Sequence, residues 1–181
     1  MRTVRARTAI AAATLAIGAG LALGPTAQAS TTQGYIAGGG SVTDDWGDEG
    51  LLSSGSHANS NATAVWQWVL WAEGVKESNG TRYDQSDIDC QFGPNTTYAT
   101  KDLQTRWGLI VDGKVGKQTF GTFDSFLELG SDGRTITYHG DYFDGYTHKF
   151  TLKRISGKYY VKDPGSGKGW KGAYYNSKTA C

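Results

Sequence analysis

Apolar residues recur at helical spacing in three separate stretches of the chain. Residues 59–74 place apolar side chains three and four positions apart, after asparagines that suit a helix start and before a terminal glycine. A second helix is predicted to start after Pro94 and Asn95 and to stop at Gly108, and a third is predicted over about 118–127. Each stretch has one apolar face, so the pattern predicts three short helices around one small core.

The pattern changes after Gly130, where β-branched and aromatic residues alternate with polar ones. The alternating stretches are RTITYHG, YTHKFTLKRI, KYYVKD and GAYYN, and the segments at 156–158 and 163–165 have the composition of turns between strands. This part predicts a small antiparallel meander. The expected fold class is therefore α+β.

Residues 30–57 contain mostly Gly, Ser, Thr and Asp and have almost no apolar periodicity. Such a segment lacks the apolar material for a core, so we predict a flexible leader. Trp46, Leu51 and Leu52 are exceptions. A short segment around these three residues is expected to dock onto the folded part.

The first 29 residues have the three-part pattern of a secretory signal. Arg2, Arg5 and Arg7 precede an apolar run that ends near Leu23, and small residues before Ser30 suit cleavage. The run is short and rich in alanine for a membrane span, although a retained amphipathic anchor is the alternative. We therefore expect a secreted protein, extracellular or associated with the cell wall, with no membrane contact after cleavage.

The charge balance differs between the two halves of the mature chain. Residues 30–128 carry 13 acidic and 6 basic residues, whereas residues 129–181 carry 4 acidic and 9 basic ones. This asymmetry indicates either two parts that attract each other or a basic end for an anionic partner, with an ordinary solvated surface as the alternative. Nucleic acid is not an expected partner of a secreted chain of this kind.

Two cysteines, Cys90 and Cys181, allow one intramolecular pairing. A secreted protein folds in an oxidising compartment, so we predict a Cys90–Cys181 disulfide. An intermolecular bridge or two free thiols are the alternatives. The bridge would join the helical part to the end of the β-rich part.

One short pattern, Asp-x-x-apolar-Gly-x-x-Thr, occurs twice. Asp89, Gly93 and Thr96 are followed 23 residues later by Asp112, Gly116 and Thr119. In each unit the aspartate can bond nearby backbone amides, the glycine permits a tight turn, and the threonine falls in the first turn of a helix. The repetition predicts two equivalent helix entries.

The sequence around these turns resembles the peptidoglycan-binding domain of the PG_binding_1 type, a three-helix module of bacterial wall hydrolases. The resemblance spans about residues 62–127 and rests on Trp66-Gln67, Leu70, Phe92-Gly93-Pro94-Asn95-Thr96, Ala99, Leu103-Gln104, Gly108-Leu109, Val111-Asp112-Gly113, Val115-Gly116 and Thr119. Three departures stand out: Cys90 at a glycine position, Lys117 at a proline position, and a longer connection at 75–87.

The resemblance implies binding to the cell wall, through polar groups near the two turns. The candidate ligand-binding residues are Asp89, Gln91, Gln104, Arg106, Asp112 and Lys114. Arginine and lysine would pair with carboxylates of wall peptides, and glutamine amides could bond in both directions. For each residue, a capping role or simple exposure is the alternative.

Candidates for catalysis are few, and we predict no catalytic residue, metal site or cofactor. His139, Asp141, Asp144 and His148 do not match a zinc motif of wall hydrolases. Both cysteines are expected in the disulfide, and nothing distinguishes Glu73, Glu77 or Glu128 as paired catalytic acids. The C-terminal aromatic residues and lysines are expected to form a core and a protected sheet edge, with contact to glycan or an anionic wall polymer as the alternative.

The predicted organisation is a signal peptide (1–29), a flexible leader (30–57), a three-helix peptidoglycan-binding domain (58–128) and a β-rich extension (129–181), joined by the disulfide. The expected function is non-catalytic binding of peptidoglycan or an associated anionic wall polymer by a monomer. Two alternatives remain: a peptidoglycan hydrolase with its catalytic group in the extension, and an interaction or inhibitor module for a secreted hydrolase.

Overall fold

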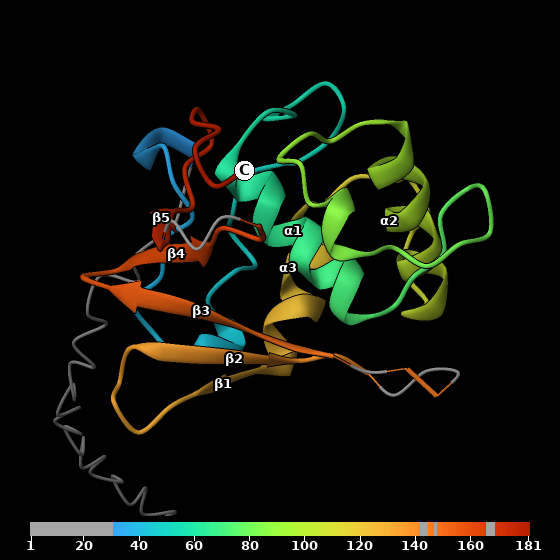
Figure 1. Cartoon of the computed structure of the whole chain (residues 1–181). Coiled ribbons are helices and arrows are strands. Elements are labelled where there is room, and N and C mark those ends of the chain that lie inside the picture. The colour runs from blue at the N-terminus through green and yellow to red at the C-terminus, as the bar shows by residue number, and fades with distance from the viewer. Residues whose placement is uncertain (1–30, 142–144, 147, 166–168) are drawn as a thin grey trace, which may run out of the picture.

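The central helix, α1 (Asn61–Ala72), begins after Ser60, whose hydroxyl accepts a hydrogen bond from the N–H of Thr63 at 3.0 Å. In the computed structural model, which describes residues 31–141, 145–146, 148–165 and 169–181, this helix lies between the other helices and the sheet (Figure 1). Nearly all its side chains are buried, because it is covered from both sides. The predicted signal peptide lies outside the described residues.

The other two helices follow the repeated turns. Helix α2 (Pro94–Arg106) starts with proline at its first position, and α3 (Lys117–Phe123) is followed by the 3-10 turn η4 (Asp124–Phe126). The third helix was predicted to reach Leu127. It ends earlier because Leu127 begins a strand, in which it pairs with Tyr138. The remaining 3-10 turns are η1 (Thr31–Gln33), η2 (Val42–Asp44) and η3 (Gln85–Asp87).

Within the described residues, five antiparallel strands form one sheet in the order of the chain, which confirms the predicted meander. They are β1 (Leu127–Leu129), β2 (Thr135–His139), β3 (Lys149–Ile155), β4 (Lys158–Lys162) and β5 (Trp170–Gly172). Ser156 and Gly157 connect β3 to β4 with φ values of 50° and 74°. Positive φ at both positions is the geometry of a tight two-residue hairpin. The α+β class is thus confirmed.

One face of the sheet packs against α1. Ile136, Phe150, Leu152 and Val161 alternate with exposed or half-buried residues along their strands and are buried on this face. The ring of Trp68 stacks on Phe150 at 5.9 Å, and its indole N–H donates to the carbonyl of Lys162. The sheet therefore covers the side chain of Trp68.

The segment before α1 differs from the predicted flexible leader. Ile36, Trp46 and Leu52 have no exposed surface, and they belong to the same hydrophobic cluster as the helices and the sheet. Backbone bridges join Ala37 to Lys158 and Leu52 to Val115. The docking expected for Trp46 and Leu52 is confirmed, whereas Leu51 stays 42% exposed. Residues 31–57 are part of the fold.

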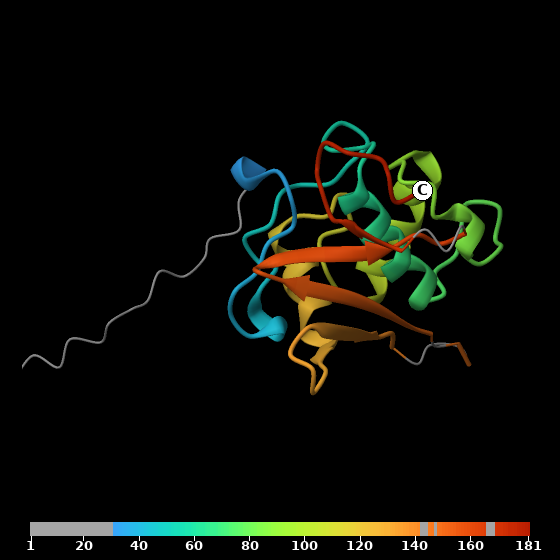
Figure 2. The same ribbon diagram turned by 60° about the vertical axis from the view of Figure 1, so that its left-hand side comes forward.

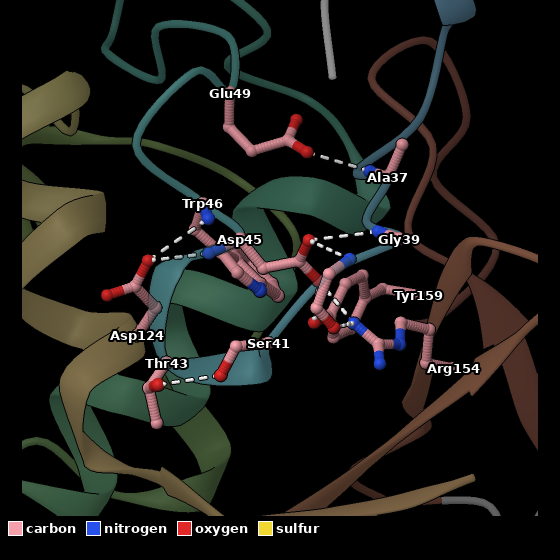
Figure 3. A network of polar contacts seen from close by, with 11 residues as sticks. Ala37, Gly39, Ser41, Thr43, Asp45, Trp46, Glu49, Asp124, Arg154 and Tyr159 are labelled. Atoms are coloured by element: carbon pink, nitrogen blue, oxygen red, sulfur yellow. Dashed lines mark hydrogen bonds and ion pairs between the residues drawn. The ribbon is translucent and has the colours of Figure 1, made fainter. Parts of the chain in front are cut away.

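Buried carboxylates fix this segment in place (Figure 3). Asp124 accepts the N–H groups of Asp45 and Trp46, both at 3.1 Å. Asp45 in turn bonds the Arg154 guanidinium at 2.6 Å and the Tyr159 hydroxyl at 2.7 Å. The segment is therefore tied both to the end of the helical part and to the sheet.

A third carboxylate, Glu49, bonds the start of the same segment. Its side chain accepts the N–H of Ala37 at 2.7 Å and the hydroxyl of Tyr175. Burial is the main cause that raises the pKa of Glu49 to about 7, while these hydrogen bonds act in the opposite direction. The contacts link residues near both ends of the described chain.

The predicted disulfide between Cys90 and Cys181 is present, with the two Cα atoms 5.9 Å apart. Cys90 has a φ of 60°, a left-handed conformation that a non-glycine residue rarely adopts. Gly113, the equivalent residue of the second turn, has a φ of 73°. The cysteine thus occupies a backbone position suited to glycine.

Candidate functional site

Each of the two repeated turns wraps around a buried glutamine amide. Gln67 of α1 accepts the N–H of Cys90 at 2.8 Å, and Gln104 of α2 accepts the N–H of Gly113 at 2.9 Å. Both glutamines are almost fully buried. The two turns therefore have the same construction. In each, the side-chain amide of a glutamine from the preceding helix bonds a backbone N–H of the turn.

The side-chain amide nitrogens of Gln67 and Gln104 also make equivalent contacts in the two turns. Gln67 donates to the Asp89 carboxylate, the carbonyl of residue 91 and the Thr96 hydroxyl, at 2.8, 3.1 and 3.3 Å. Gln104 donates to the Asp112 carboxylate, the carbonyl of residue 114 and the Thr119 hydroxyl, at 3.0, 2.8 and 3.3 Å. The recurrence of aspartate and threonine in the sequence follows from these two matching sets of contacts.

These contacts assign a turn-building role to several candidate ligand residues. The amide of Gln104 is 1% exposed and is occupied on both its atoms. Asp89 and Asp112 each also accept the N–H two residues later, from Gln91 and Lys114. The outward side chains of Gln91 and Lys114 are exposed, so a ligand role for them stays a prediction.

Arg106 lies away from both turns and joins α2 to the end of α1. Its guanidinium donates to the carbonyl of Glu73 at 3.0 Å and lies 4.0 Å from that residue's carboxylate. Glu73 also accepts the hydroxyl of Tyr138 and the N–H of Asp141. Burial raises the pKa of Glu73, and the hydrogen bonds partly offset this effect. These contacts hold α1, α2 and β2 together.

The three acids considered for catalysis have different contacts. Glu73 is 1% exposed, which leaves no room for a substrate to reach it. Glu77 bonds the Thr81 hydroxyl and the Asn95 amide, and Glu128 contacts His139 at 2.9 Å. Each of the three carboxylates thus has its own separate surroundings.

The histidines considered for a metal site lie in different environments. The ring of His148 stacks on Trp71 at 4.5 Å, whereas His139 contacts Glu128. Asp144 of the same sequence stretch lies outside the described residues. Within the part of the chain that the structure describes, no group of three or more His, Cys, Asp or Glu residues could hold a metal ion.

Two shallow cavities flank the second turn. One, of about 230 Å³, is lined by Leu51, Gln104, Ile110, Asp112, Lys114, Gly116, Lys117, Gln118 and Thr119. The other, of about 310 Å³, is lined by Ser54, Pro94, Thr97, Tyr98 and Lys101. A Cβ atom on Gly113 would come within 2.9 Å of the Thr97 side chain, so the turn packs closely against α2 between them.

Exposed apolar side chains gather around this turn. Leu51, Tyr98, Ile110 and Val111 are between 42% and 70% exposed, and Ile110 is the most exposed. Lys101, Lys114 and Lys117 lie beside them. These seven residues are called the second-turn surface below. Apolar groups next to convergent charges are typical of a binding surface.

Sequence reasoning missed most of this surface. Leu51 was placed in the leader, although Leu52 next to it pairs with Val115 and so brings it to the second turn. Tyr98, Ile110 and Lys117 were not selected, because the motif emphasises residues that build the turns. The available sequence signal was the apolar Ile110-Val111 pair just before Asp112.

A larger cavity, of about 450 Å³, lies beside the disulfide. It is lined by Gln85, Ser86, Ile88, Asp163, Pro164, Gly165 and Cys181. Asp163 is the one charged side chain in that lining. The cavity shares no residue with the second-turn surface, and we assign no function to it.

Replacing Gln104 with alanine should destabilise the second turn. The change leaves the N–H of Gly113 and the Asp112 carboxylate without the amide that bonds them, and the free energy of unfolding should fall by about 2–3 kcal/mol. Urea denaturation of the variant measures this loss. Gln118→Ala, an exposed neighbour, is the control and should change stability by less than about 0.5 kcal/mol.

Residues 79–122 match the family model described as a putative peptidoglycan binding domain. The matched segment starts before η3, ends within α3 and contains both turns. The predicted resemblance is therefore confirmed for this part of the chain. No curated protein and no solved structure matches the chain.

Proposed function

We propose that the protein is a secreted, non-catalytic protein that binds peptidoglycan through the second-turn surface. One observation carries the proposal: every residue lining the 230 Å³ cavity, except Leu51, falls within the segment that matches the peptidoglycan-binding family. The family match supports the ligand, and the exposed apolar and charged groups support this location.

The chemistry of the surface suits the stem peptides of the wall polymer. These peptides carry carboxylates, which the ammonium groups of Lys114 and Lys117 would bind as charge partners. Ile110 and Leu51 would cover the aliphatic parts of the peptide, and burial of each removes apolar area from water. The rigid turn beneath them reduces the entropy lost on binding.

A polymeric ligand compensates for weak contacts at one site. Peptidoglycan repeats the same peptide many times, so a bound molecule that dissociates meets another copy nearby. The predicted signal peptide at residues 1–29 would deliver the protein to this polymer. No helix among the described residues is long and apolar enough to span a bilayer.

Co-sedimentation with insoluble peptidoglycan, stripped of its anionic polymers, tests the proposal. The Ile110→Ser/Lys114→Gln variant should bind about tenfold more weakly than the unchanged protein, since it removes an exposed apolar anchor and a charge partner. Both residues are exposed, so the fold should persist, which thermal unfolding would verify.

The control variant is Ile155→Ser/Lys178→Gln, which removes the same residue types from exposed positions elsewhere. It should bind as well as the unchanged protein. Absence of binding by the unchanged protein, or equal losses in the two variants, would refute the proposal. Release of soluble wall fragments would instead support the hydrolase alternative.

A further inference from the structure

The face of the sheet that points away from α1 carries a regular row of lysines. Successive residues of a strand point to opposite faces, and the residues packed against α1 are buried. The opposite face therefore holds Lys149 and Lys153 of β3 together with Lys158 and Lys162 of β4. Figures 1 and 2 show the helices on the other side of these strands.

The register of the two strands staggers these lysines. Lys153 lies opposite Tyr160, and Lys158 lies opposite Ile155. The same register places Lys162 across from position 151, between Lys149 and Lys153. Along the strand direction, one lysine therefore occurs at intervals of roughly 6.6 Å, alternately from β3 and from β4. The result is a zigzag of four ammonium groups.

Aromatic rings hold two of these ammonium groups in position. Lys153 lies over the ring of Trp170, 4.8 Å from its centre. Lys158 lies over the rings of Tyr35 and Tyr174, and it donates to the Tyr174 hydroxyl at 2.9 Å. Ordering the charges in advance reduces the entropy cost of binding an anion.

The four lysines have no carboxylate partner among the described residues. Two carboxylates, Glu128 and Asp132, lie at the β1 end of the sheet. Glu128 contacts His139, and hydrogen bonds from Thr135, with a smaller effect of Lys153, lower the pKa of Asp132 to about 2. The β3–β4 part of the face thus carries four positive charges, of which Lys153 has a small electrostatic interaction with Asp132.

We propose that this face binds an extended anionic polymer whose backbone repeats phosphodiester groups, and that it does so independently of the second-turn surface. A line of point charges at regular spacing complements a linear polymer with regularly spaced charges. Stacking on neutral sugar rings is the less favoured mode, because Lys153 already contacts the ring of Trp170.

The test measures binding of the full protein to poly(glycerol phosphate) by titration calorimetry at several salt concentrations. The Lys149→Gln/Lys162→Gln variant removes two exposed lysines whose ammonium groups make no hydrogen bond or ion pair within the described residues. It should bind at least about tenfold more weakly, and the slope of log K against log salt should become shallower by about one to two. Lys76→Gln/Lys178→Gln removes the same charge elsewhere and should change affinity less than about twofold.

Three results would overturn the proposal: no binding of the polymer, equal losses in the two variants, or equally tight binding of a polycarboxylate of matched charge. Binding to stripped peptidoglycan should be unaffected by the sheet variant. The proposed function and this inference can therefore fail separately, because each has its own ligand and its own variant.

Discussion

The double variant Cys90→Ala/Cys181→Ala should lose about 4 kcal/mol of unfolding free energy. The disulfide closes a loop with a sequence separation of 91 residues, so its removal releases a large part of the unfolded chain. Cys181 is the last residue, and its bridge fixes the C-terminal segment to the first repeated turn. Chemical denaturation without reductant, compared with the unchanged protein, measures the loss.

A second variant separates the effect of the disulfide from the effect of the positive φ at residue 90. Cys90→Gly/Cys181→Ala also lacks the bridge, but glycine adopts a φ of 60° without the strain that alanine has there. It should therefore be about 1 kcal/mol more stable than the double-alanine variant. If the two variants unfold at the same denaturant concentration, the positive φ at this position makes no contribution to stability.

The Asp45→Ala variant should lose about 3–5 kcal/mol of unfolding free energy. It leaves the Arg154 guanidinium and the Tyr159 hydroxyl without the carboxylate that bonds them at 2.6 and 2.7 Å (Figure 3). The N–H of Gly39 also loses its acceptor. Asp44→Ala, at the exposed neighbouring position, is the matched control, and thermal and urea unfolding compare the two.

A double-mutant cycle locates the source of this loss. Arg154→Met removes the partly buried charge that Asp45→Ala leaves unpaired, so the double variant should be more stable than the sum of the single losses implies. Simple additivity would show that the ion pair does not couple the segment before α1 to β3.

The periodic stretches of the sequence predicted most of the architecture. The helical spacing in residues 59–74 and the alternation after Gly130 led to the helices and the meander, because each such element buries one face. The two cysteines allowed a single pairing. The end of the third helix was wrong, since local periodicity carries no information about a strand pairing formed by residue 127.

The segment at 31–57 was misjudged for a physical reason. Its few apolar residues are too sparse to form a core by themselves, but each enters a core that the rest of the chain builds. Trp46, for example, packs against Phe123 of α3 at 4.7 Å and Tyr159 of β4 at 4.6 Å. Buried aspartate and glutamate side chains add further contacts, although an acidic composition taken alone indicates disorder.

The candidate site was only partly predictable. The motif identified the two turns correctly, but its two glutamines, Gln67 and Gln104, face inward and bond backbone N–H groups that would be costly to leave unpaired. The surface beside the second turn comes from residues such as Leu51 and Ile110, which the motif does not include. A family motif consists of residues that the fold requires, and these residues need not contact a ligand.

The packing of residues 31–57 has a practical consequence for transplanting the helical module. Excision of residues 58–128 alone would remove Trp46 from its place beside α3 and Leu51 from the rim of the 230 Å³ cavity. It would also cut the Cys90–Cys181 cross-link. Fusion to a cargo enzyme therefore requires residues 31–181 to be kept together as one folded unit.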